Sequence, residues 1–208
     1  MKNNLLFRGS SRALTLATIA FGANFSVWVL YAVLALELQH RLSLTALDLG
    51  LLFAAPMLTG ALLRIPAGFL ADRFNPKYLY GAQMLIVVPS LLALPYMSSL
   101  VDHMLLGLWI GISGTSFTFG ISYVTDWFER NQQGTAMGIF GAGNAGAAIT
   151  LAAAPYIVDK WGWENIGPIY AVGLLMVALV FLWLAPSRPR QAENARFEKI
   201  SISLKEIV

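Results

Sequence analysis

One arginine interrupts a long apolar segment in the first third of the chain. It is Arg64, within the stretch Gly60-Ala-Leu-Leu-Arg-Ile-Pro-Ala-Gly68. An arginine near the centre of a bilayer costs roughly 2.5–3.5 kcal/mol on insertion scales, and ionisable groups at such positions mark binding sites or ion pathways. A guanidinium binds two oxygens of a flat anion side by side, whereas a lysine offers a point charge. Arg64 is therefore a candidate anion-binding residue; the alternative is a structural arginine satisfied by helix carbonyls.

The helix face that would carry Arg64 is lined by small side chains. Residues three, four and seven positions apart share one face of a helix. Around Arg64 these residues are Gly60, Ala61, Ala67, Gly68 and Ala71. Lipid-facing surfaces carry bulky apolar side chains, while close contacts between helices use small ones. We therefore expect Arg64 to face protein or a cavity rather than lipid.

The composition is that of an all-α integral membrane protein. Of 208 residues, 57% are hydrophobic and 12% are charged, whereas a soluble domain carries about 25% charged residues. Cysteine is absent, which excludes a disulfide framework and a thiolate metal site. We expect no metal and no cofactor. We also expect no nucleic-acid partner, because the positive charges follow membrane topology.

Six apolar runs are each long enough to cross a bilayer, which takes about 20 residues. They are Leu14–Leu38, Leu47–Ala71, Tyr78–Met97, Met104–Phe128, Gly134–Val158 and Gly167–Ala185. The sequence thus predicts three parts: a cytoplasmic N-terminus over 1–13, a six-helix transmembrane half-bundle over 14–185, and a cytoplasmic linker over 186–208 that looks truncated.

Lysine and arginine are distributed unevenly between the predicted loops. Segments on the side of the N-terminus hold eleven of them, the opposite loops hold two (Arg41 and Lys160), and Arg64 remains inside a span. Positive residues concentrate on the cytoplasmic side of membrane proteins. Both ends of the chain are therefore predicted to be cytoplasmic.

The predicted spans contain no carboxylate near their centres, and both histidines, His40 and His103, fall in predicted outer loops, where we expect them to be solvated. Proton-coupled carriers commonly use intramembrane Asp, Glu or His. Their absence favours exchange of anions, or coupling through groups outside this chain, over a proton relay. The spans also lack a His/Asp/Glu/Ser constellation for catalysis, so we do not expect an enzyme.

The segment between the second and third spans resembles a loop motif of the major facilitator superfamily. Its residues follow the pattern Gly68-x-x-x-Asp72-Arg73-x-x-x-Lys77. The resemblance implies that these four residues form a cytoplasmic gating loop. Asn75 stands where the family has glycine, and asparagine tolerates a left-handed backbone.

The fourth and fifth spans resemble the nitrate/nitrite porter branch of that superfamily. They contain Gly114-Thr-Ser-Phe117 and Gly134-Thr-Ala-Met-Gly-Ile-Phe-Gly141-Ala-Gly143-Asn144-Ala-Gly146. The resemblance implies that Arg64 holds nitrate or nitrite and that Phe117 packs on the flat anion. It also implies that Gly141, Gly143 and Asn144 belong to the substrate-binding signature.

Each of these residues also has a structural alternative. Glycines spaced in this way usually serve close helix packing, Phe117 could be a packing residue, and Asn144 could bond either the anion or a neighbouring helix. The fifth-span motif is shorter than in many members of the branch and lacks its first asparagine. A carrier for another small or organic anion, or a non-transporting membrane assembly protein, therefore remains an alternative.

The family fold consists of two six-helix halves with the substrate between them at the membrane midplane. The six predicted spans correspond to the N-terminal half. The resemblance implies a bacterial plasma-membrane protein that works by alternating access, with a second six-helix half or a second copy of itself as its partner.

Overall fold

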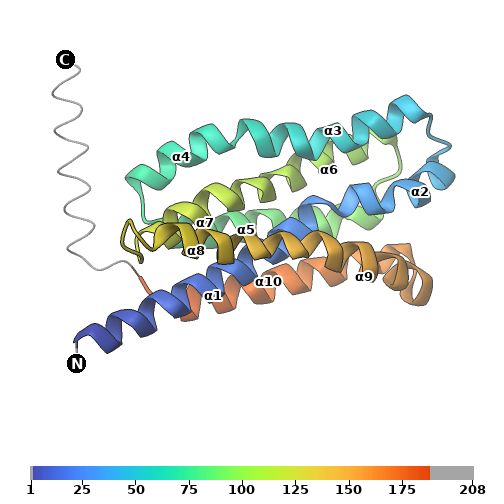
Figure 1. The fold of residues 1–208 in the computed structure, drawn as a ribbon. Coiled ribbons are helices and arrows are strands. Elements are labelled where there is room, and N and C mark those ends of the chain that lie inside the picture. The colour runs from blue at the N-terminus through green and yellow to red at the C-terminus, as the bar shows by residue number, and fades with distance from the viewer. Residues whose placement is uncertain (1, 188–208) are drawn as a thin grey trace, which may run out of the picture.

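The computed structural model describes the backbone of residues 2–187 and the side chains of residues 9–34 and 37–187. This part of the chain is helical, and its long helices run side by side (Figure 1). The α-helices are α1 Lys2–Trp28, α2 Leu30–Leu42, α3 Ala46–Leu62, α4 Arg64–Arg73, α5 Pro76–Ala93, α6 Leu100–Ile110, α7 Ser116–Thr125, α8 Gln133–Gly141, α9 Ala145–Trp161 and α10 Ile166–Leu184. Short 3-10 turns are η1 Leu94–Tyr96, η2 Gly111–Thr115, η3 Ala142–Asn144 and η4 Trp163–Asn165.

Six segments of the described chain are long and apolar enough to cross a membrane, which confirms the predicted number of spans. They are Gly9–Leu34, Ala46–Arg73, Pro76–Tyr96, Leu100–Thr125, Gln133–Trp161 and Trp163–Leu184. The observed boundaries extend past most of the predicted ones because helices continue into polar flanks that hydropathy alone leaves out. The predicted linker lies outside the described residues from residue 188 onwards.

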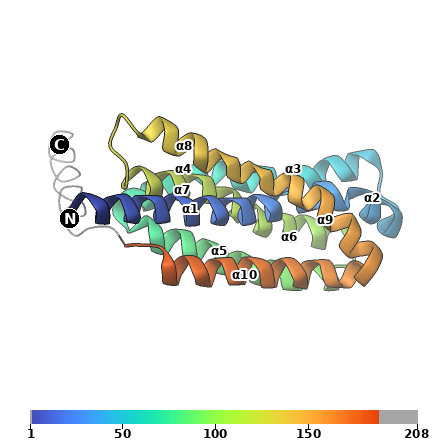
Figure 2. The same cartoon turned by 60° about the horizontal axis from the view of Figure 1, so that its bottom comes forward.

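Local signals define where several helices begin. Thr45 and Asp48 form a reciprocal capping box at the start of α3, and Ser99 and Asp102 do the same for α6. Such boxes satisfy backbone N–H groups that the first helical turn leaves unpaired. The α4–α5 loop and the N-terminus lie at one end of the bundle, and the α2–α3 connection lies at the other (Figures 1 and 2).

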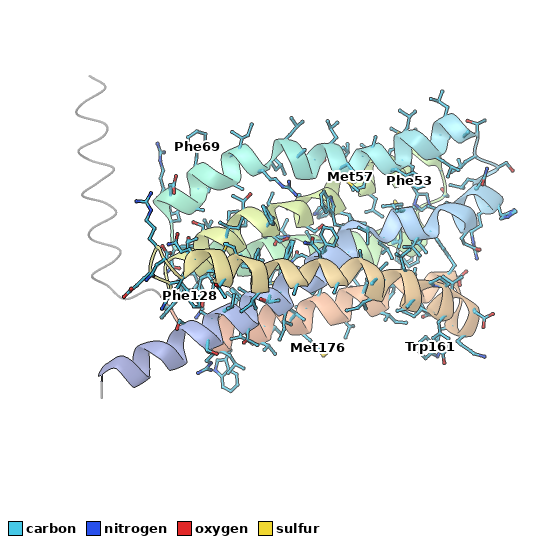
Figure 3. All side chains as sticks on the ribbon, viewed as in Figure 1. Phe53, Met57, Phe69, Phe128, Trp161 and Met176 are labelled. Carbon is cyan, nitrogen blue, oxygen red and sulfur yellow. The ribbon has the colours of Figure 1, made fainter. Side chains whose placement is uncertain are left out.

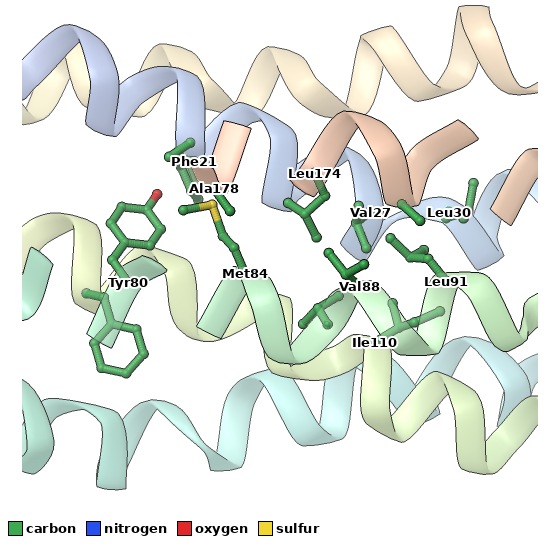
Figure 4. Packing of buried hydrophobic residues seen from close by; sticks show 14 of the residues in the cluster. Phe21, Val27, Leu30, Tyr80, Met84, Val88, Leu91, Ile110, Leu174 and Ala178 are labelled. Atoms are coloured by element: carbon green, nitrogen blue, oxygen red, sulfur yellow. The ribbon is translucent and has the colours of Figure 1, made fainter. Parts of the chain in front are cut away.

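The packed core lies between α5, α10 and α1. Tyr80 and Met84 of α5 are buried in this core (Figure 4). The ring of Tyr80 meets that of the buried Phe181 of α10 edge to face, with centroids 5.0 Å apart. A Cβ on Gly81 would lie 2.2 Å from the Leu182 side chain. A larger residue at this position would therefore force the Leu182 side chain of α10 to move.

Large apolar side chains cover the outside of the bundle. Met57 and Phe69 project from α3 and α4, and Met176 projects from α10 (Figure 3). A soluble protein would expose few such residues in contiguous patches. This surface fits a lipid environment and agrees with a multi-pass membrane protein.

Four of the six spans depart from regular α-helix in their interior. The first span breaks at Val29, the second at Leu63, the fourth contains η2 and the fifth contains η3. Irregular backbone at membrane depth is tolerated where protein or a cavity surrounds it. In transporters, interrupted helices form the binding sites, and Leu63 directly precedes Arg64.

One prediction about the histidines is wrong. His103 is not a solvated loop residue: it lies in α6 within a candidate span, and only 1% of it is exposed. Its Nδ1 lies 3.3 Å from the hydroxyl of Tyr31, and its ring meets Trp163 edge to face. The α6 helix begins four residues earlier than the hydropathy run suggested, because the Ser99–Asp102 capping box precedes it. His40, by contrast, is exposed as expected.

Candidate anion site

Arg64 is the first residue of α4 and lies between three spans. Its Nε donates a hydrogen bond of 3.4 Å to the carbonyl oxygen of Gly114 in η2. Its guanidinium carbon lies over two aromatic rings, 5.4 Å from the centroid of Trp28 and 5.4 Å from that of Phe117. The side chain is partly buried. Arg64 thus faces neighbouring helices and not lipid, as the small-residue face predicted.

The terminal nitrogens of Arg64 have no hydrogen-bond or ion-pair partner among the described residues. A guanidinium carries five N–H donors in a planar fork, and only Nε is committed here. The alternative of a structural arginine satisfied by helix carbonyls is met in part: Nε has such a partner, and the rest of the fork has none in the described part of the chain. The two N–H groups that bind an oxyanion side by side are available.

Arg64 also differs from the other described charges by its depth. The remaining acidic and basic residues of the described spans lie within about one turn of a span end, whereas Arg64 is nine residues from the end of Ala46–Arg73. At 1.5 Å per residue this is about 13 Å. A charge in low-dielectric surroundings attracts an anion far more strongly than one in water. This depth makes Arg64 a candidate for attracting an anion within the membrane.

Close backbone packing brings these residues together. A Cβ on Gly114 would lie 2.9 Å from the Cα of Gly60, and one on Gly60 would lie 2.9 Å from Nε1 of Trp28. Small residues at such contacts let helices approach closely. Here Gly60 and Gly114 let α3, η2 and the Trp28 ring meet immediately beside Arg64.

Phe117 is at the edge of an aromatic cluster and is 37% exposed. Its ring lies 5.7 Å from Phe21 of α1 and 6.2 Å from Phe140 of α8, and the rings of Phe21 and Phe140 stack at 4.7 Å. The cluster supports Phe117 from behind and leaves part of its ring accessible. This placement suits an aromatic residue that packs on a ligand held by Arg64.

The fifth-span residues do not reach Arg64 directly. Asn144 is exposed, and its Nδ2 donates a 2.9 Å hydrogen bond to the carbonyl of Gly141 on the preceding turn. A Cβ on Gly141 would meet nothing within 4 Å, whereas one on Gly143 would lie 2.5 Å from Phe21 and 3.1 Å from the nitrogen of Gly22. Gly143 therefore packs α1 against η3, and Gly141 and Asn144 stand on an open face. Their substrate-binding role stays a prediction.

The loop between the second and third spans ends in a helix cap. Asn75 has an extended backbone with φ −66°, not the left-handed one that its tolerance allowed, and its side chain accepts the N–H of Lys77 at 3.0 Å. Pro76 then opens α5 at the position where its missing N–H costs nothing. Asn75 therefore acts as the N-cap of α5.

The four residues of the predicted gating loop have different environments. Asp72 and Arg73 are exposed at the end of α4, and Gly68 is half-buried within it. Lys77 is buried to 6% exposure, and its Nζ lies 3.5 Å from the hydroxyl of Ser187. The gating role of these residues is not tested by this geometry and stays a prediction.

Sequence reasoning missed Trp28, which contacts Arg64 from the first span. One signal could have found it: an indole in the middle of an apolar span must place its N–H on a partner. In the structure that partner is the carbonyl oxygen of Pro56, at 3.0 Å. Which residue lies above the indole depends on how three spans pack together, and no local pattern contains that information.

Six apolar helices around a partly buried arginine define a multi-pass membrane protein with a candidate anion site. The sequence profile of the Major Facilitator Superfamily matches residues 16–207. The chain therefore belongs to this superfamily, which comprises transporters and not enzymes, and the resemblance of the loop between the second and third spans to that superfamily is confirmed.

Several curated relatives carry names that refer to nitrate or nitrite. The chain is 29% identical to the probable nitrate/nitrite antiporter NarK1 of Thermus thermophilus, over 89% of this chain and 44% of the relative. It is 31% identical to the nitrite extrusion protein of Bacillus subtilis, over 80% and 42%. It is 32% identical to the probable nitrate/nitrite transporter NarK2 of Mycobacterium tuberculosis, over 90% and 48%. The chain thus spans about half the length of these relatives.

The fold is similar to that of a bacterial homologue of the human lysosomal transporter Spinster. In the inward-facing, occupied conformation the TM-score is 0.75 at 19% sequence identity, and 87% of this chain matches 45% of that one. In the inward-facing, unoccupied conformation the TM-score is 0.71 at 20% identity. At this identity the likeness establishes the fold alone, and it again covers about half of the longer chain.

Proposed function

We propose that this chain is one six-helix half of a secondary transporter for a small flat anion, nitrate or nitrite, and that Arg64 binds the anion. The observation that carries the proposal is the state of the Arg64 side chain. Its guanidinium rests over the rings of Trp28 and Phe117, and its terminal N–H groups have no partner among the described residues. The guanidinium is thus held in place by two rings, and its terminal N–H groups can donate to an anion.

The side chains of Arg64 and Phe117 favour an anion that is flat. A planar oxyanion can accept two parallel hydrogen bonds from the guanidinium and lie against the exposed part of Phe117. Nitrate and nitrite are monovalent, so a single arginine can neutralise them. The names of the relatives in Thermus and Bacillus support this substrate class.

Alternating access requires a second set of helices. The chain spans about half of its relatives, and family members bind substrate between two halves that rock against each other. We propose that the open face bearing Asn144 and Gly141 completes the site together with a second six-helix half. Exchange of anions remains the proposed mode of transport, in the bacterial plasma membrane with both termini cytoplasmic.

The test is exchange in liposomes that contain the transporter to which this chain belongs. Vesicles are loaded with nitrite, nitrate is added outside, and both anions are followed with time. Arg64→Lys keeps the charge and removes the fork. We expect it to slow exchange at least tenfold, since hydrogen bonds to a charged group contribute about 1.5–3 kcal/mol.

The matched control is Arg41→Lys. Arg41 is an exposed arginine of α2 that pairs with Glu37. The anion exchange rate of the Arg41→Lys variant should equal that of the wild type. Normal exchange of both anions by Arg64→Lys would exclude the proposed role of Arg64. If the wild-type protein transported organic anions but neither nitrate nor nitrite, the proposed substrate class would be wrong.

A further inference from the structure

We infer that Trp28 determines the size of anion that the Arg64 site accepts. The inference rests on the proposed function, because it assigns a selectivity role within the same site. Trp28 is the last residue of α1, directly before the break at Val29 that separates α1 from α2. A residue at this break can turn its ring towards α3 and η2, where the second and fourth spans meet beside Arg64.

The indole ring is held in a defined orientation. Its Nε1 donates a 3.0 Å hydrogen bond to the carbonyl oxygen of Pro56 in α3, which satisfies the one polar atom of the side chain. Its ring also meets that of Phe25 nearly edge to face, with centroids 5.5 Å apart. Trp28 therefore presents a fixed apolar face to the guanidinium of Arg64.

The same ring fills the space between two spans. A Cβ on Gly60 would lie 2.9–3.1 Å from three atoms of the indole, and a Cβ on Gly114 would lie 3.1 Å from Cε2 of the indole. Gly60 and Gly114 thus leave the space that the Trp28 ring occupies, and the three residues together close one side of the site. A ligand bound to Arg64 cannot extend in that direction.

Phe117 bounds the guanidinium from another span at the same 5.4 Å distance as Trp28. Two aromatic faces from different helices confine a planar cation and favour a single orientation of it. They leave the edge of the guanidinium, where the N–H groups point, as the place for a ligand. A small planar anion fits such an edge, whereas a bulky substituent on the anion would collide with a ring.

The experiment measures selectivity rather than activity alone. In liposomes with the transporter, uptake of nitrate is inhibited by a series of planar carboxylates of rising size: formate, acetate and benzoate. The wild type should be inhibited by formate far better than by benzoate. Trp28→Ala should reduce that discrimination about tenfold or more, since pocket size alone discriminates by this order.

Two variants separate selectivity from folding. Trp28→Phe keeps a smaller ring over Arg64 and loses the bond to Pro56 and part of the ring volume, so its discrimination should lie between those of the wild type and Trp28→Ala. Trp183→Ala removes an exposed tryptophan of α10 and should match the wild type. If Trp28→Ala does not fold, Trp28→Met is used for the same inhibition series, because it also lacks a ring.

The outcomes decide between the two proposals. Wild-type uptake that Arg64→Lys impairs, combined with unchanged discrimination in Trp28→Ala or Trp28→Met, would overturn the inference and leave the proposed function intact. Equal loss of discrimination in Trp28→Phe would also overturn it, because the ring face would then not be the cause. Absence of nitrate and nitrite transport in the wild type would instead remove the proposed function.

Discussion

Gly60 and Gly114 lie so close together that a Cβ on Gly114 would stand 2.9 Å from the Cα of Gly60. The two residues belong to the second and fourth spans, and each adjoins the site: Gly60 lies one turn before Arg64, and Gly114 provides the carbonyl that accepts its Nε. The contact therefore sets the position of both the cation and its acceptor. Helix packing and the geometry of the candidate anion site therefore involve the same two glycines.

Gly114→Ala should separate the second and fourth spans and move the acceptor of Arg64. Overpacking a close contact costs about 1–3 kcal/mol, so we expect a lower melting temperature in detergent and a clear loss of nitrate uptake. Gly50→Ala is the control, because a Cβ there meets nothing within 4 Å. Unchanged melting and uptake in Gly114→Ala would show that this contact does not limit the site.

Two glycines of the fifth span should respond in opposite ways. A Cβ on Gly146 would lie 2.1 Å from the carbonyl oxygen of Gly22, and Ser26 donates to the Gly146 carbonyl at 2.8 Å. Gly146→Ala should therefore lower the yield of folded protein sharply. Gly141→Ala should fold normally, because its Cβ meets nothing, and should weaken nitrate uptake if the open face lines the site. If Gly141→Ala folds and takes up nitrate normally, Gly141 is needed neither for helix packing nor for anion binding.

Asn144→Ala separates a binding role from a structural one. Asn144 is exposed, and its side chain bonds only its own helix within the described chain, so stability should change by less than about 0.5 kcal/mol. A lost hydrogen bond to a bound anion would raise the half-saturating nitrate concentration about tenfold. Melting and nitrate uptake are measured on the same preparation. A large fall in melting temperature would instead indicate a helix-packing role.

Asn75 provides a test of the loop. If it acts as the cap of α5, Asn75→Asp should be tolerated and Asn75→Ala should destabilise the protein by about 1 kcal/mol. Asn75→Gly should cost only a few tenths of a kcal/mol. Thermal melting of the three variants measures this order. Asn75→Ala as stable as the wild type would argue against the cap seen between Asn75 and the N–H of Lys77.

The orientation of the chain can be tested because it contains no cysteine. Single variants Ser98→Cys and Gln132→Cys place a thiol in exposed positions at opposite ends of the bundle. A membrane-impermeant thiol reagent should label Ser98→Cys in intact cells. It should label Gln132→Cys only after the cells are permeabilised. The reverse pattern would place the termini outside the cytoplasm.

The sequence was sufficient to determine the number of spans, the membrane class and the special position of Arg64. Hydropathy sums over about 20 neighbouring residues, so a span is visible without knowledge of the partners it packs against. The small residues that share a face with Arg64 follow from the helical repeat alone. The loop motif led to the correct superfamily for a similar reason, since its residues are contiguous in the chain.

Only the tertiary structure showed what touches Arg64 and what lies buried. Trp28 and Phe117 are distant in sequence from Arg64 and from each other, yet both rings contact it. They do so where the first and second spans are interrupted and the fourth contains the 3-10 turn η2. His103 and Lys77 lie near span ends, where hydropathy predicts exposure, yet neighbouring helices cover them. Burial and ring contacts depend on how helices pack in three dimensions, and a one-dimensional pattern of apolar residues does not contain that packing.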